Sequence, residues 1–150
     1  MTVHLRPARP TDAGRTGEIL HGFAREKAWM PELWSEAETI AHCGAMIDRG
    51  WVTVLECEGR VEGFMARDGE EIVALYLAPQ ARAQGLGRLL LAAAQDACKR
   101  LHLRAFAANT RARRFYERHG FVAAGQGCGA ENDENLPDIA YVWTKERAAA

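Results

Sequence analysis

The sequence predicts an α+β fold, with a mixed, mostly antiparallel sheet of about seven strands flanked by about four helices. Three strand-like stretches lie in succession between residues 51 and 78, and the short turns Glu58-Gly59 and Asp68-Gly69 separate them. Turns of this kind join antiparallel strands. A helical stretch then leads to a further strand, and a helix crossover favours parallel pairing. We therefore expect one domain over residues 1–150, with one parallel strand pair on either side of this helix.

Local signals define the expected elements. Thr11 or Asp12 is placed to cap a first helix, and Ser35 with Glu38 forms an S-x-x-E capping box for a second. Gly120 stands in the C-cap position of the last expected helix. Strands are expected at residues 3–8, 51–56, 60–67, 70–78, 101–108, 121–125 and 138–145, and helices at residues 10–26, 35–49, 85–100 and 111–120.

Composition argues against several classes of function. With 19 basic and 20 acidic side chains, the net charge of −1 gives no indication of a nucleic-acid surface. No apolar stretch approaches the ~20 residues that cross a bilayer, and the N-terminus lacks the apolar core of a signal peptide, so we expect a cytoplasmic protein without a membrane partner. The cysteines and histidines lack metal-binding spacing, so we expect reduced thiols and no metal. The four cysteines are Cys43, Cys57, Cys98 and Cys128.

The stretch "RAQGLGRLLLA" (residues 82–92) places two glycines in front of a strong helical pattern. The first amides of a helix are unpaired and carry the positive end of its dipole, so they bind phosphates. Gly85 and Gly87 have no β-carbon to block the approach, and Arg82 and Arg88 add positive charge. Neither a lysine-bearing P-loop nor a dinucleotide fingerprint is present. We predict a phosphate-binding loop; the alternative is a glycine turn that serves helix packing alone.

A second motif, "NTRARRFYERHGF", occupies residues 109–121. Together with the upstream R-x-x-G-x-G and the order of the expected elements, it resembles the GNAT superfamily of acetyl-CoA-dependent N-acetyltransferases. The resemblance implies the GNAT fold, in which the parallel strand pair splays apart. It also implies acetyl-CoA as co-substrate.

The resemblance further implies which residues bind the coenzyme. Arg82, Gly85 and Gly87 match the family's pyrophosphate loop, and Asn109 matches an asparagine that contacts the cofactor. Leu75–Leu77 matches the strand whose backbone binds the pantetheine arm and the acetyl carbonyl. The implied cofactor-binding residues are Leu75, Tyr76, Leu77, Arg82, Ala83, Gln84, Gly85, Leu86, Gly87, Arg88 and Asn109.

Two side chains are candidates for proton transfer. Tyr116 matches the tyrosine that the family places near the thioester sulfur, and a phenol with a pKa of about 10 can protonate a departing thiolate. Glu71 is placed like a glutamate that some members use as a base, directly or through water. Arg104 stands where some relatives carry another glutamate, which leaves Glu71 or a water chain as the base. The alternatives are a core-packing role for Tyr116 and an exposed carboxylate at Glu71.

In this family the acceptor binds between the first two helices and the loop that joins the last two strands. Indole faces and carboxylates both attract ammonium groups, so these segments suit a cationic amine, either a small molecule or a peptide amine. Tryptophans that serve packing and a solvated charged loop are the alternative. The candidate acceptor residues are Trp29, Met30, Trp34, Glu131 and Glu134, with Asp133 and Asp138 beside them.

The function predicted in this way is an N-acetyltransferase in which a primary amine attacks acetyl-CoA directly. A homodimer would fit the habit of the family. One alternative is a non-catalytic acyl-CoA sensor of the same fold. A second is an enzyme that binds a different phosphate ligand, such as a nucleotide, at the same helix end.

Overall fold

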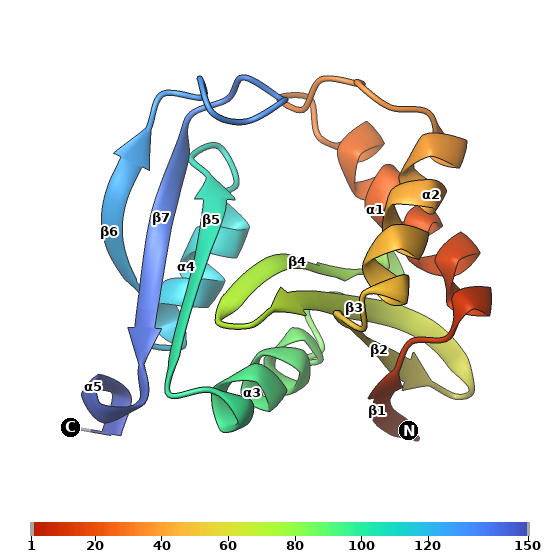
Figure 1. Cartoon of the computed structure of the whole chain (residues 1–150), viewed down its shortest axis with the longest axis horizontal. Coiled ribbons are helices and arrows are strands. Elements are labelled where there is room, and N and C mark those ends of the chain that lie inside the picture. Colours follow the sequence, from red (N-terminus) through yellow and green to blue (C-terminus); the bar gives the residue numbers. More distant parts are fainter. Residues whose placement is uncertain (1, 150) are drawn as a thin grey trace.

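A computed structural model describes residues 2–149, and within them seven strands form one sheet in the order β1-β2-β3-β4-β5-β7-β6 (Figure 1). Neighbouring strands are antiparallel except β4 and β5, which are parallel. The predicted α+β class, the antiparallel meander and the parallel pair are therefore confirmed. The strands are β1 (Val3–Pro7), β2 (Val52–Cys57), β3 (Arg60–Asp68), β4 (Glu71–Leu77), β5 (Arg100–Phe106), β6 (Val122–Gly127) and β7 (Asp138–Thr144).

The helices follow the expected order, with two corrections. The chain after β7 was expected to remain extended through Lys145, but it turns into a short helix there. The helix before β5 was expected from Gly85, but it begins at Gly87, because Gly85 has a φ of +74° that no helix accommodates. The helices are α1 (Ala13–Glu26), α2 (Glu36–Asp48), α3 (Gly87–Ala97), α4 (Thr110–Arg118) and α5 (Lys145–Ala149), and short 3₁₀ turns lie at Pro10–Asp12 and Pro79–Ala81.

The caps of the first two helices differ from each other. The Ser35 hydroxyl accepts a hydrogen bond from the Glu38 amide at 3.1 Å, and the Glu38 carboxylate accepts one from the Ser35 amide at 3.0 Å, so the predicted capping box is confirmed. Asp12 holds the N-cap position of α1, but its carboxylate accepts bonds from the Arg6 guanidinium and the Arg9 amide instead of capping α1.

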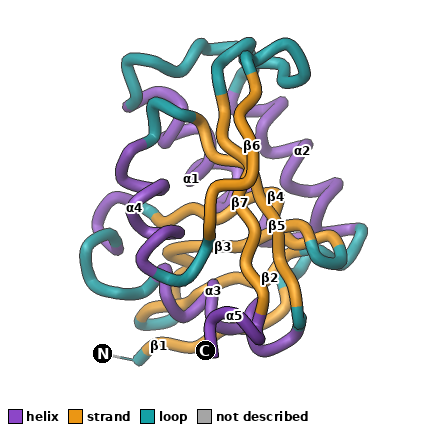
Figure 2. Tube along the Cα trace, turned by 90° about the vertical axis from the view of Figure 1, so that its left-hand side faces the viewer, coloured by secondary structure: helices purple, strands orange, loops and turns teal. Residues whose placement is uncertain are grey.

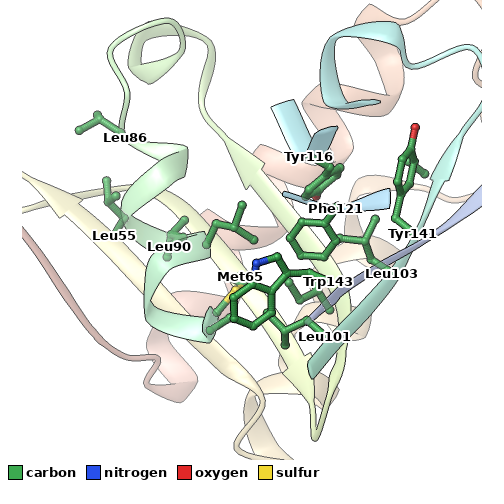
Figure 3. Packing of buried hydrophobic residues seen from close by; sticks show 14 of the residues in the cluster. Leu55, Met65, Leu86, Leu90, Leu101, Leu103, Tyr116, Phe121, Tyr141 and Trp143 are labelled. Atoms are coloured by element: carbon green, nitrogen blue, oxygen red, sulfur yellow. The ribbon is translucent and has the colours of Figure 1, made fainter. Parts of the chain in front are cut away.

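Each face of the sheet carries its own hydrophobic cluster. Ile19 and Cys43 belong to the cluster under α1 and α2, whereas Leu90 and Tyr116 belong to the cluster under α3 and α4. In the second cluster, the Tyr116 and Phe121 rings lie 5.6 Å apart, and Phe121 stacks on Trp143 at 6.4 Å (Figure 3). The buried face of α4 therefore fixes Tyr116 against the sheet.

The parallel pair is held at one end. β4 and β5 share a single register pair, Glu71 with His102, supported by a hydrogen bond of 2.9 Å from the His102 amide to the Glu70 carbonyl. Beyond it the strands diverge: in Figure 1, β4 crosses the view while β5 runs steeply upward. The edge of β4 from Val73 to Leu77 that faces away from β3 thus has no strand partner among residues 2–149, and the predicted splayed pair is confirmed.

A β-bulge in β4 decides which way its side chains point. Ile72 pairs with Arg67 and Ala74 with Ala66, so Val73 is an extra residue in the ladder. Ile72 packs into the α3 side of the sheet, while Ala74, two residues on, packs into the α1 and α2 side. After the bulge, Tyr76 faces α1 and Leu75 faces α3.

Two loops lie at the end of the molecule opposite the chain termini. The segment between α1 and α2 and the segment between β6 and β7 both lie at the top in Figures 1 and 2, whereas the ends of the chain lie at the bottom. The space between these loops holds the second of the two cavities described below.

Candidate active site

The larger cavity has a volume of about 620 Å³ and lies where β4 meets α3 and α4. Of the eleven residues predicted to bind the cofactor, Gln84 alone is missing from its lining; the Gln84 side chain instead donates to the Gln80 carbonyl at 2.8 Å. The structure thus brings together two motifs that are distant in the sequence. The lining residues are Phe23, Lys27, Leu75, Tyr76, Leu77, Arg82, Ala83, Gly85, Leu86, Gly87, Arg88, Asn109, Arg111, Ala112, Phe115, Tyr116, Arg118 and His119.

The glycine loop turns sharply into α3. Ala83 and Gly85 have φ values of +61° and +74°, and Leu86 precedes the first helical residue, Gly87. A β-carbon added at Gly87 would lie 3.5 Å from Phe115 and 3.6 Å from Leu77, which is ordinary van der Waals contact. Backbone conformation therefore explains the glycine at position 85, but packing does not require one at position 87.

The basic residues that line this cavity make different contacts. The Arg82 side chain forms an ion pair with Glu26, and its Nε donates to the Leu77 carbonyl at 3.2 Å, so it joins the end of β4 to α1. Arg88 stands in the first turn of α3. The structure adds Arg111 and Arg118 of α4, together with Lys27, which were not among the predicted residues.

Sequence spacing contains the signal for the α4 residues. Arg111, Phe115 and Arg118 are four and three residues apart, which places them on one face of a helix. Asn109 caps this helix, because its side chain accepts a hydrogen bond of 3.2 Å from the Ala112 amide. The motif around Tyr116 thus supplies charge, apolar surface and a cap as well as the tyrosine.

Tyr116 is buried, with 8% of its surface exposed, yet it lines the larger cavity. Its hydroxyl has no hydrogen-bond partner within residues 2–149, where every fully buried side-chain oxygen has one, so the hydroxyl opens onto the cavity. Burial, and less strongly the charge of Tyr76, raise the pKa of Tyr116 well above its ordinary value. The phenol therefore stays protonated at neutral pH.

A second cavity, of about 340 Å³, lies between α1, α2, β5 and the β6–β7 loop. It shares Phe23 and Tyr76 with the larger cavity, and their rings lie 5.0 Å apart. Burial raises the pKa of Tyr76 to about 12, with a smaller contribution from Glu134. These two aromatic rings form the wall at which the cavities meet.

The predicted acceptor residues fall in different places. Met30, Trp34, Asp133 and Glu134 line the second cavity. Trp29 packs against Phe23 and Phe106 with ring centroids 6.2 and 5.8 Å apart, while Glu131 is exposed outside the lining. The lining residues not predicted for this site include His21, Arg25, His42, Arg104 and Phe106.

Glu71 lies outside the lining of both cavities. It starts β4 and pairs with His102 of β5. The five residue steps from Glu71 to Tyr76 span roughly 15 Å of extended chain. Direct proton transfer between Glu71 and an acceptor beside Tyr76 is therefore out of reach.

Two further classes of site have no counterpart in the part of the chain that the structure describes. Across residues 2–149 there is no cluster of three or more histidine, cysteine or acidic side chains that could hold a metal ion. No helix in that range combines the length and the apolar character needed to cross a membrane.

Known proteins resemble this chain in both sequence and fold. Residues 48–123 match the sequence profile of the acetyltransferase (GNAT) domain. A 5-NmdU N-acetyltransferase of Pseudomonas phage PaMx11 is 35% identical over 95 residues, which cover 58% of this chain and 68% of that protein. The peptidyl-lysine N-acetyltransferase YjaB of Salmonella typhimurium is 36% identical over 76 residues, or 51% of this chain and 52% of that protein. The structure of YncA from Salmonella typhimurium with acetyl-CoA superposes with a TM-score of 0.74 at 20% identity, covering 96% of this chain and 94% of that one.

The split sheet, the glycine loop at the start of α3 and the sequence match together define a protein of the acetyltransferase class. The chain belongs to the GNAT acetyltransferase family, as its two motifs predict.

Proposed function

We propose that this protein transfers the acetyl group of acetyl-CoA to a primary amine. The observation that carries the proposal is the junction of two cavities at Phe23 and Tyr76, with the Tyr116 hydroxyl open to the larger one. A long ligand in the larger cavity and an acceptor in the smaller one would meet at this wall.

The larger cavity suits coenzyme A in both chemistry and shape. The loop from Ala83 to Arg88 offers unpaired amides at the positive end of α3, with Arg88, Arg111 and Arg118 nearby for phosphate groups. The open edge of β4 offers backbone donors and acceptors to the amide-bearing pantetheine arm, in the manner of an added strand. When bound, acetyl-CoA supplies a thioester carbonyl that is activated toward amines.

Tyr116 is the proposed general acid. Its hydroxyl is protonated, faces the cavity and makes no hydrogen bond within residues 2–149, so its proton is available to the leaving thiolate. Backbone amides of β4 stabilise the developing oxyanion without any side chain.

Glu71 remains the proposed base, acting through water. The face of β4 that carries Glu71 before the bulge is the face that carries Ala74 and Tyr76 after it. Ordered water along this face would carry the proton, because the Glu71 side chain reaches neither cavity. Loss of the acidic limb of the kcat/KM–pH profile in Glu71→Gln would support this role, and an unchanged limb would remove it.

The acceptor is an amine, by analogy with relatives whose names specify 5-NmdU and peptidyl-lysine. The small volume of the second cavity favours a small molecule or a single side chain. The four cysteines are unpaired in the structure, which supports a reducing compartment such as the cytoplasm.

The decisive experiment is calorimetric titration with acetyl-CoA, followed by a free-thiol assay over a panel of amines. Binding together with thiol release that depends on an amine is the expected result. Binding without release for any amine would favour the acyl-CoA sensor. Binding of ATP or NAD in place of acetyl-CoA would favour a different phosphate ligand and overturn the proposal.

A further inference from the structure

The second cavity carries charged groups of both signs. Arg25 and Arg104 line it together with Glu32, Asp133 and Glu134. Arg25 and Glu32 lie 3.9 Å apart and are both about two-thirds exposed, so they form a weak surface pair. The remaining charges are those of Arg104 on β5 and of the two acidic residues of the β6–β7 loop, which line the same cavity.

Arg104 is oriented by the fold. Its neighbours Leu103 and Ala105 are buried in the α3 cluster, so strand alternation points Arg104 to the opposite face, which the cavity occupies. Its Nη1 donates to Asp138 Oδ1 at 3.0 Å, and Asp138 is buried. The Arg104 side chain is still 55% exposed, and its other N–H groups meet no acceptor within residues 2–149. Asp138 thus fixes a guanidinium whose remaining edge is open to a carboxylate.

Glu134 lines the same cavity. It is half-buried and forms no ion pair among the described residues. Its charge acts on Tyr76, the residue that separates this cavity from the larger one. A cationic nitrogen held by Glu134 would therefore lie beside the wall at which the two cavities meet.

We propose that the acceptor is a small amine that also carries a carboxylate, such as an amino acid, with its ammonium at Glu134 and its carboxylate on Arg104. This inference rests on the proposed acetyltransferase function and names its substrate class. A plain alkylamine would gain from Glu134 but would leave the open edge of the Arg104 guanidinium without an acceptor, which disfavours it. In the reaction the amine nitrogen bonds to the acetyl carbon and the carbon–sulfur bond breaks. The acceptor ammonium loses two protons, one to the thiolate by way of Tyr116 and one to solvent.

The test compares each amino acid with the amine that remains when its carboxylate is removed. Suitable pairs are phenylalanine with 2-phenylethylamine, methionine with 3-(methylthio)propylamine, and 4-aminobutyrate with propylamine. A lysine peptide blocked at both ends represents a peptide acceptor. We expect kcat/KM to be about tenfold to a hundredfold higher for at least one amino acid than for its matched amine, as a charge-assisted bond implies.

Two variants assign this preference to Arg104. Arg104→Gln should abolish it by raising KM for the amino acid much more than KM for the plain amine. Arg100→Gln removes an equivalent charge from an exposed position on the same strand, outside the cavity, and should leave the preference intact. If Arg104→Gln does not fold, the comparison of each amino acid with its matched amine in the wild-type protein still tests the inference.

Each other outcome overturns the inference. Equal or faster acetylation of plain amines shows that no carboxylate is recognised, and turnover confined to the blocked peptide shows a peptide acceptor. Binding of acetyl-CoA with no turnover of any panel member also counts against it. Failure to bind acetyl-CoA is a separate result, because it refutes the proposed function itself.

Discussion

At the scale of single residues, Gly87 and Tyr116 carry the strongest functional evidence, because packing does not account for either choice. A methyl group would fit at Gly87, and the Tyr116 hydroxyl satisfies no partner within residues 2–149. Because folding requires neither the glycine at position 87 nor the hydroxyl at position 116, both indicate a role in binding or reacting with a ligand. Both residues therefore give sharp tests of the site.

Gly87→Glu should lower the affinity for coenzyme A by at least about a hundredfold. The new carboxylate would occupy the approach to the first amides of α3 and would repel phosphate. Calorimetry measures the effect. Gly87→Ala is the control for folding, because its β-carbon finds only ordinary contacts, and it should keep a thermal midpoint near that of the wild type. Unchanged coenzyme A affinity in Gly87→Glu would contradict the phosphate-binding role of the loop.

Tyr116→Phe should lower kcat by about a hundredfold while leaving the affinity for coenzyme A nearly unchanged, because loss of a general acid acts on the transition state. The ring contacts with Phe115 and Phe121 remain, so the thermal midpoint should also remain. A steady-state rate equal to that of the wild type would leave Tyr116 with a packing role alone.

At the scale of elements, the sequence was informative wherever a short pattern dictates local geometry. The Ser35–Glu38 capping box and the two hairpin turns are such patterns. The bulge at Val73 is different, because it depends on how β4 pairs with β3 and leaves no periodic mark. The bulge turns Tyr76 into the wall between the cavities, a position that simple alternation along β4 does not provide.

The positions of the charged residues in the two cavities likewise depend on how distant elements pack, which local sequence patterns do not specify. The spacing of Arg111 and Arg118 predicts that they share one face of α4. Their position beside the glycine loop, however, depends on the tertiary fold. The Arg104 side chain is held at the second cavity because β7 lies beside β5 and supplies Asp138. Glu71, by contrast, was predicted from its place in the chain, and the length of β4 keeps it away from both cavities.

The contact between α1 and α2 supplies a matched pair of glycine variants. A β-carbon at Gly17 would lie 2.5 Å from Ile40 Cγ1 and 2.7 Å from its Cα, whereas one at Gly22 meets nothing within 4 Å. Gly17→Ala should reduce the free energy of unfolding by about 1–3 kcal/mol through overpacking. Gly22→Ala should raise it by about 0.5–1 kcal/mol through helix propensity.

Urea denaturation of both variants measures this difference. Because the two positions lie on one helix, the sign of the change separates packing from propensity. Equal changes in both variants would mean that α1 and α2 are not as closely packed as the structure describes.

At the scale of the whole molecule, a partly buried ionic group joins the first strand to the turn that precedes α1. Arg6 donates to both oxygens of Asp12, at 2.8 and 3.1 Å, and pairs with Glu56 of β2. The hydrogen bond from Arg6 is the main cause of a lowered pKa at Asp12, with burial acting in the opposite direction. This cluster links the N-terminal part of the chain to the sheet.

The stability of the protein should therefore depend on pH through Asp12. A carboxyl with a depressed folded-state pKa stabilises the fold above its unfolded pKa, near 4, and this contribution is lost as the pH falls through the lower folded value. Asp12→Asn should lose stability at pH 7 and show a flatter decline as the pH falls below about 4. Urea midpoints over this range measure the effect, and an equally steep decline in both proteins would assign it to other carboxylates.

The single position at which β4 and β5 pair determines how the two halves of the sheet are held together. Beyond Glu71 and His102 the two halves of the sheet diverge, and a ligand bound between them would bridge them. The affinity for that ligand therefore depends on the angle between the two halves of the sheet. Substitutions far from the cavity that alter this angle would change coenzyme affinity without touching the coenzyme.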